Sequence, residues 1–252
     1  MLLRREPDGA VVAIGQPSHA WVSGQLARAW GGGRFGAVEP WEEVCLAAEQ
    51  HDVGMAEWDV RPSLDAATGL PHSFMEMPLD VHMGLWAQAA GKLVAQSRYA
   101  ALLVSMHGAA LYEMRDLDRM PDDDAAAVRA FLADRRDEQE RLLAALGGEP
   151  RDRVRRNQRL VWTWDYLSLA LCLDWAPATA RRVPAAEGEV DVELAPAGAG
   201  RVALDPWPFR EARVAVRCEG RRLTGTFADE GSMREALAAA PWVAVERELV
   251  PA

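Results

Sequence analysis

Cysteine and lysine are scarce in this chain of 252 residues. The three cysteines, Cys45, Cys172 and Cys218, lie far apart and form no Cys-x-x-Cys pair. Their number and spacing argue against a disulfide framework and against a thiolate zinc site. Lys92 is the only lysine, so the choice of arginine over lysine at any single position carries little information.

Long apolar runs are absent as well. No stretch is long enough to cross a bilayer, and residues 1–12 lack the apolar segment of a signal peptide. These features predict a cytoplasmic protein without a membrane partner. The net charge of -10 also disfavours nucleic acid as a partner, because nucleic acid is itself a polyanion. A small anionic substrate remains compatible with this charge, since a bound metal ion inverts the local field.

The order of hydrophobic patterns predicts a mainly α-helical protein. A hairpin at residues 1–15 turns at Pro7-Asp8-Gly9, and the helical domain that includes it is expected to span residues 1–176. Residues 177–252 are expected to form a small C-terminal β or α+β appendage. Helices are predicted at residues 17–30, 40–52, 79–97, 99–114, 123–146 and 152–174, and strands at 190–194, 201–204, 213–218, 223–227 and 243–246.

Histidines on apolar helix faces carry the clearest chemical signal. His51, His82 and His107 each align with hydrophobic residues three or four positions away, whereas the face of His19 is less defined. A histidine alone in such a setting is most simply a core residue with one hydrogen bond. Several inward histidines in one domain favour a shared metal ion, because neutral imidazole is a common ligand.

Two aspartates extend this pattern. Asp165 lies in an apolar helical segment, where its carboxylate needs a cation such as a metal ion or a nearby arginine. Asp52 follows His51 directly, and both side chains can reach one ion if the helix ends there, with Gly54 as a plausible terminator. The sequence therefore predicts a metal site that includes His51, Asp52 and Asp165.

These positions resemble the HD superfamily of metal-dependent phosphohydrolases. The resemblance covers about residues 16–175 and rests on an early histidine, a His-Asp doublet at a helix end and a late helical aspartate. It implies an HD-type helical bundle. The metal ligands that it implies are His19, His51, Asp52, His82, His107 and Asp165.

The resemblance also implies an activity. One or two ions of Fe, Mn, Co, Ni or Zn would activate water against a small phosphoester or nucleotide, with His51, Asp52, His82 and His107 as catalytic residues. Arg61 and Arg98 are candidates for binding the phosphoryl group. Two alternatives stay open: a di-iron oxygenase that cleaves a carbon bond, and a non-catalytic metal-binding or sensory module.

Overall fold

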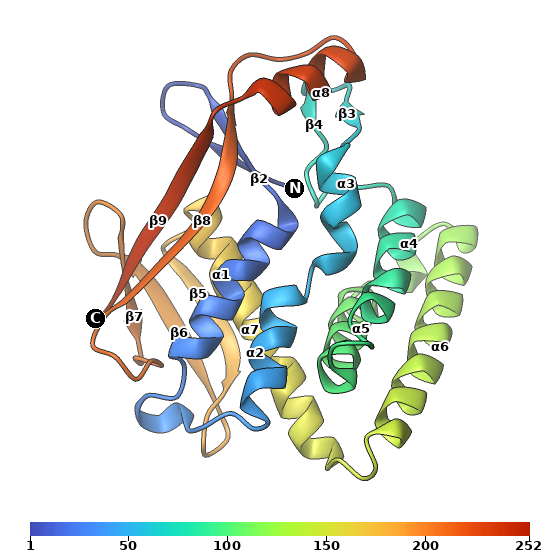
Figure 1. Cartoon of the computed structure of the whole chain (residues 1–252), viewed down its shortest axis with the longest axis vertical. Helices are drawn as coiled ribbons and strands as arrows, with labels where there is room; N and C mark the ends of the chain where they lie inside the picture. The colour runs from blue at the N-terminus through green and yellow to red at the C-terminus, as the bar shows by residue number, and fades with distance from the viewer.

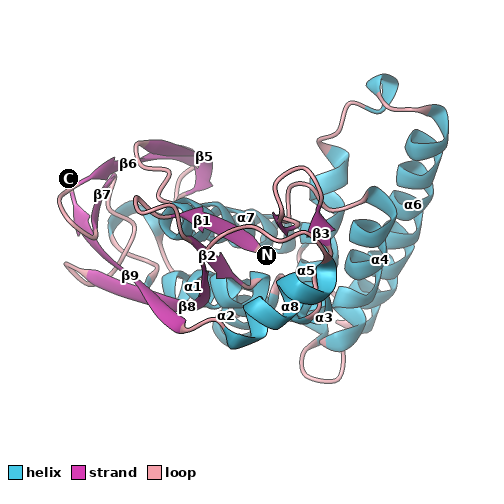
Figure 2. Cartoon of the chain, turned by 90° about the horizontal axis from the view of Figure 1, so that it is seen from above, coloured by secondary structure: helices cyan, strands magenta, loops and turns pink.

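A seven-stranded sheet curls along one side of the molecule, and helices fill the other side (Figures 1 and 2). The computed structural model describes all residues, 1–252. The helices are α1 (Gln16–Ala29), α2 (Trp41–Gln50), α3 (Ala56–Val60), α4 (Leu79–Ala89), α5 (Arg98–Glu113), α6 (Asp122–Ala145), α7 (Arg151–Leu173) and α8 (Glu230–Ala239). The strands of the sheet are β1 (Leu2–Arg5), β2 (Val11–Ile14), β5 (Ala178–Pro184), β6 (Glu189–Pro196), β7 (Arg201–Asp205), β8 (Val214–Leu223) and β9 (Trp242–Pro251). A separate two-stranded pair contains β3 (Leu64–Asp65) and β4 (Leu70–Pro71).

The sheet overturns the prediction of a mainly α-helical bundle with a small C-terminal appendage. Its strand order is β1-β2-β8-β9-β7-β6-β5, so the N-terminal hairpin and the C-terminal strands form one structure. Val11 of β2 lies opposite Leu223 of β8, and Ile14 lies opposite Gly220. A lone hairpin is marginal in water, and this pairing with β8 extends the hairpin into a larger sheet. The partners are about 200 residues apart, and no local pattern reports such a contact.

Helices α1 and α7 connect the sheet to the remaining helices. Helix α1 packs against β8, and α7 packs against β5 and β1. Helix α2 packs against α1 and α5, while α4 and α6 pack on α5 away from strands β5, β6 and β7 (Figures 1 and 2). One hydrophobic cluster of 48 buried residues runs from Leu2 to Leu249, so sheet and helices share a core.

Trp30 shows how the core joins the two halves. Its ring is fully buried and makes edge contacts with Phe35, Trp164 and Phe209, at centroid distances of 5.1, 5.6 and 5.6 Å. The glycine run after α1 allows this approach: a Cβ atom at Gly32 would lie 1.8 Å from the carbonyl oxygen of Phe209. The glycine run thus admits the segment between β7 and β8.

Several predicted boundaries change in detail. The helix predicted at 79–97 ends at Ala89 and continues as a short 3₁₀ turn. The strand predicted at 213–218 is part of the longer strand β8, and the strand predicted at 223–227 is wrong, because β8 ends at Leu223. Strand β5 and helix α8 were not predicted. Residues 53–78, where neither a helix nor a strand was predicted, contain α3 and the β3–β4 pair.

All three cysteine thiols are buried and free of disulfides. Cys172 of α7 and Cys218 of β8 nevertheless approach to 3.6 Å between their sulfur atoms. None of the helices combines the length and the apolar character that crossing a membrane requires.

Candidate metal centre

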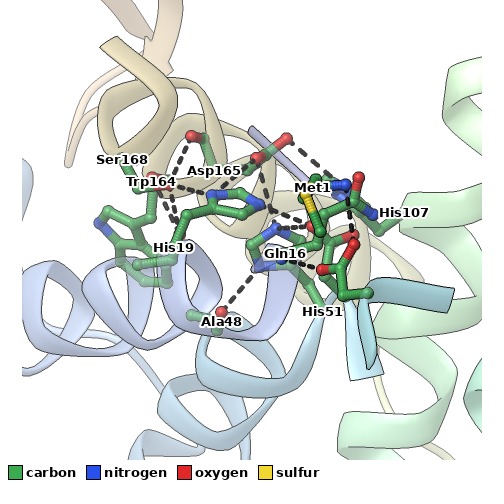
Figure 3. Close-up of polar contacts among 12 residues, drawn as sticks. Met1, Gln16, His19, Ala48, His51, His107, Trp164, Asp165 and Ser168 are labelled. Carbon is green, nitrogen blue, oxygen red and sulfur yellow. Dashed lines mark hydrogen bonds and ion pairs between the residues drawn. The ribbon is translucent and has the colours of Figure 1, made fainter. Parts of the chain in front are cut away.

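Three histidine and aspartate side chains converge where α1, α2 and α7 meet. His19 comes from α1, His51 follows the last residue of α2, and Asp165 lies on α7. Each offers one ligand atom, and these atoms lie within 4.8 Å of one another. Figure 3 shows both imidazole rings directed toward the Asp165 carboxylate. The structure therefore contains a group that can hold a metal ion, as the sequence predicted.

The end of α2 brings Asp52 to the same place. The helix stops at Gln50, and the backbone at Asp52 (φ -100°, ψ 18°) has left the helical path. Asp52 Oδ2 consequently lies 3.6 Å from His51 Nε2 and 2.6 Å from His19 Nε2. The expected helix end is confirmed, but Gly54 has another role: a Cβ atom there would lie 2.6 Å from the carbonyl oxygen of Leu85 in α4.

His51 Nε2 is a buried atom without a hydrogen-bond partner. The other ring nitrogen, Nδ1, donates to the carbonyl oxygen of Ala48 at 2.8 Å, so the neutral ring carries its lone pair on Nε2. This lone pair faces Asp165 Oδ1 at 3.3 Å. Two acceptors at this distance need a cation, either a proton on the ring or a metal ion between them.

The tautomer of His19 is fixed in the same way. The Ser168 hydroxyl donates to the carbonyl oxygen of Asp165 at 2.8 Å, so its oxygen accepts the Nδ1 proton of His19 at 2.8 Å. Ser23 supports Ser168 from α1, with 3.0 Å between the two hydroxyl oxygens. His19 Nε2 is hydrogen bonded to Asp52 Oδ2 at 2.6 Å, a contact that a shared metal ion would replace. An outer hydrogen bond that directs a lone pair inward is characteristic of histidine ligands of metals.

The pKa shifts within the cluster also favour a bound cation. Burial lowers the pKa of His51, but the carboxylates of Asp52 and Asp165 outweigh burial and raise it to about 9. Burial raises the pKa of Asp52 and Asp165, but the nearby histidines outweigh it and lower both below the ordinary range. Both carboxylates are therefore ionised at neutral pH, and they supply the negative charge that a divalent cation needs.

Around His51, the spacing of the donor atoms fits a transition metal ion. Metal–ligand bonds of about 2.0–2.2 Å at tetrahedral angles place neighbouring ligand atoms about 3.4 Å apart. The distances from His51 Nε2 to Asp165 Oδ1 and to Asp52 Oδ2 are 3.3 and 3.6 Å, whereas His19 Nε2 and Asp52 Oδ2 lie at the hydrogen-bond distance of 2.6 Å and would have to separate around an ion. The unpartnered Nε2 and the two carboxylates thus suit an ion with nitrogen and oxygen ligands.

The structure brings His107 to the cluster, whereas His82 lines the neighbouring cavity and bonds other side chains. His107 Nε2 lies 3.5 Å from Asp165 Oδ2, and its Nδ1 is buried without a hydrogen bond. Both nitrogens of His82 are occupied, because Trp86 Nε1 donates to Nε2 at 3.0 Å and Nδ1 is hydrogen bonded to the Tyr112 hydroxyl. Burial lowers the pKa of both histidines to about 4, so both are neutral at pH 7.

A cavity of about 210 Å³ opens beside the cluster. Arg115 is the only basic residue that lines it besides the histidines, and Arg61 and Arg98, which the sequence suggested for phosphoryl binding, are not among its lining residues. Arg98 instead donates to the carbonyl oxygen of Ala145 and borders a wider surface hollow that contains no histidine. The cavity is lined by Gln16, His19, Asp52, Phe74, Met75, Met77, His82, Trp86, His107, Leu111, Arg115, Asp165 and Leu169.

Three functional candidates were missed by sequence reasoning. Arg115 follows the end of α5 without any motif, Gln16 stands at the start of α1, and Ser168 lies in an apolar helical segment. Only Ser168 had a local signal, since it lies three residues after Asp165 on the same helix face.

The chain belongs to the DUF3891 family, whose profile, described as a protein of unknown function, matches residues 1–225. No curated protein and no solved structure matches the chain. This finding overturns the resemblance to the HD superfamily, and the curled sheet is inconsistent with an HD-type helical bundle. The match includes the N-terminal hairpin and most of the C-terminal strands, which the resemblance at residues 16–175 left out.

Proposed function

We propose that this protein is a metal-dependent hydrolase that acts on a small phosphoester. The observation that carries the proposal is the buried, unpartnered Nε2 atom of His51, which faces two ionised carboxylates. In the proposed site, His19, His51, Asp52 and Asp165 hold one divalent transition metal ion. Such an ion lowers the pKa of a coordinated water toward neutrality and so supplies a nucleophile at pH 7.

The cavity supports a catalytic site rather than a structural one. Catalytic metal sites keep a coordination position open for water or substrate, so an ion held by these four side chains must take a fifth ligand from the cavity. His19, Asp52 and Asp165 all line the cavity, so the proposed ligands are reached from it.

Charge supports an anionic substrate. Asp52 and Asp165 balance a divalent ion, and Arg115 leaves the cavity with a net positive charge. In our proposal the Arg115 guanidinium binds the phosphoryl oxygens, and the neutral His107 ring contacts the substrate beside Asp165.

The hydrogen bonds of His82 favour one ion over two. A second ion between Asp52, His82 and His107 would need a lone pair on His82, and both of its nitrogens are engaged by Trp86 and Tyr112. In our proposal His82 therefore shapes the cavity wall. This arrangement gives no support to a paired iron centre for oxygen chemistry.

Metal analysis combined with turnover tests the proposal. Purified protein should contain about one metal ion per chain and should hydrolyse p-nitrophenyl phosphate with Mn²⁺, Fe²⁺, Co²⁺, Ni²⁺ or Zn²⁺. His51→Gln and Asp165→Asn should lose both the ion and the turnover. His72→Gln is the matched control, because His72 lies outside the cluster and bonds Ser63.

The proposal fails if His51→Gln retains the metal content of the wild-type protein. It also fails if the loaded wild-type protein hydrolyses no phosphoester.

A further inference from the structure

The size of the cavity limits the substrates that the proposed hydrolase can enclose. Its volume of about 210 Å³ is below the roughly 300–1,000 Å³ of pockets that enclose drug-sized ligands. A nucleotide needs room for a base and a sugar besides its phosphate, and a phosphodiester needs room for two organic groups. A phosphate ester of one small alcohol fits the available space.

Arg115 supplies an anchor for one anionic group. Its guanidinium carbon lies 4.7 Å from the centroid of the Tyr112 ring, and this exposed side chain forms no ion pair in the structure. Stacking on the ring restricts where the guanidinium lies, while its hydrogen-bond donors stay free. A planar donor group of this kind matches two oxygens of a phosphoryl group.

Gln16 supplies a polar contact that lacks a partner in the protein. It lines the cavity and is only 3% exposed, yet its Oε1 atom is buried without a hydrogen bond. Its backbone is held at the start of α1, because its N–H donates to the Asp59 carboxylate. Buried amides are almost always hydrogen bonded, so this one points to a ligand with a complementary group.

The rest of the cavity is largely apolar. Its apolar lining residues include Phe74, Met77, Leu111, Leu169 and Trp86. Such a wall favours a substrate whose organic part is apolar over one whose organic part is charged, because burial of apolar surface is favourable and desolvation of charge is costly.

We infer that the substrate is a compact phosphomonoester with an apolar body, an inference that rests on the proposed hydrolase function. Its phosphoryl group lies between the metal centre and Arg115, its body packs on Leu111 and Leu169, and Gln16 hydrogen-bonds one of its polar groups. Water forms the new bond to phosphorus, the bond to the ester oxygen breaks, and the leaving alcohol takes a proton. The products are inorganic phosphate and a small alcohol.

Binding of phosphonates that resist hydrolysis tests the inference separately from turnover. Isothermal titration of the Mn²⁺-loaded protein should show that phenylphosphonate binds at least tenfold more tightly than the phosphonate analogue of adenosine monophosphate. Arg115→Gln should weaken phenylphosphonate about 10- to 100-fold, the range of a charge-assisted hydrogen bond. Gln16→Ala should weaken it about 3- to 10-fold. Arg119→Gln is the matched control, because Arg119 is exposed and lies outside the cavity.

The outcomes separate the two proposals. Equal or tighter binding of the nucleotide analogue, or unchanged affinity in Arg115→Gln, would overturn the compact substrate. If phenylphosphonate binds as expected but no phosphomonoester is hydrolysed, the ligand class stands and the hydrolase function fails.

Discussion

Raising the pH from 6.5 to 9 is expected to destabilise the metal-free protein through His51. In the unfolded chain this histidine has its ordinary pKa of 6.5; in the folded protein burial lowers the pKa, but Asp52 and Asp165 outweigh burial and raise it to about 9. The folded state therefore binds the proton more tightly than the unfolded chain does. The resulting stability is complete below pH 6.5 and is lost as the pH rises through about 9.

The size of this effect follows from the two pKa values. Each pKa unit corresponds to about 1.36 kcal/mol, so the change from 6.5 to 9 corresponds to roughly 3 kcal/mol of unfolding free energy. Below pH 6.5 the protein instead loses stability as the pH falls, because burial lowers the pKa of His82 and His107 to about 4. Their stability is present above pH 6.5 and is lost as the pH falls through 4, so the metal-free protein should be most stable near pH 6.5.

A bound metal ion should remove the loss of folding stability at high pH. The ion binds the neutral form of His51, so protons compete with it less as the pH rises. At about 100 times its dissociation constant, an ion adds about 2.7 kcal/mol of stability. Stability at pH 8 should therefore approach or exceed the value at pH 6.5 once Mn²⁺ is present.

Urea unfolding followed by tryptophan fluorescence measures these changes. Wild-type protein and His51→Gln are compared from pH 6.5 to 9 with EDTA, and at pH 6.5 and 8 with Mn²⁺. In His51→Gln the unfolding free energy should not decline above pH 6.5, because this variant lacks His51 and keeps all other titrating groups. An equal decline in wild type and variant would refute the reasoning, because the proton would then be bound elsewhere.

Three further substitutions test the surroundings of the site. Ser168→Ala should weaken metal binding about 10- to 100-fold in a chelator competition, because the α1 histidine loses the bond that orients its ring; unchanged affinity would contradict this. Gly32→Ala should cost about 1–3 kcal/mol or more in thermal unfolding, since its Cβ atom would overlap the Phe209 carbonyl; a wild-type melting temperature would disprove the close contact. Tyr112→Phe should cost about 1–3 kcal/mol by removing the partner of His82, yet leave the metal content unchanged. A lower metal content in that variant would show that His82 takes part in metal binding.

Local sequence patterns predicted much of the helical part and part of the site. The predicted range of the second helix correctly placed its end at the His51-Asp52 doublet, and the apolar face around Asp165 correctly indicated a buried carboxylate. Both signals are local, since helix ends and helix faces depend on residues within one or two turns. Arg115 had no such signal, because only folding brings the end of α5 next to the cavity.

The restriction of sequence patterns to local signals also explains why the prediction of an HD-type bundle was wrong. Spacing of histidines and aspartates along helices is compatible with more than one arrangement of those helices. The strand pattern of β1, β2 and β6 to β9 was visible, but the pairing of β2 with β8 depends on contacts between the two ends of the chain.

The sequence by itself indicated the main helices between residues 17 and 174, the end of α2 at the His51-Asp52 doublet and the buried setting of Asp165. The tertiary structure alone decided that the hairpin and the tail share one sheet. It alone also decided that His82 is engaged by Trp86. The physical reason is the same in each case: helix periodicity and burial are encoded over a few residues, whereas strand pairing and hydrogen bonds between helices depend on how distant segments pack.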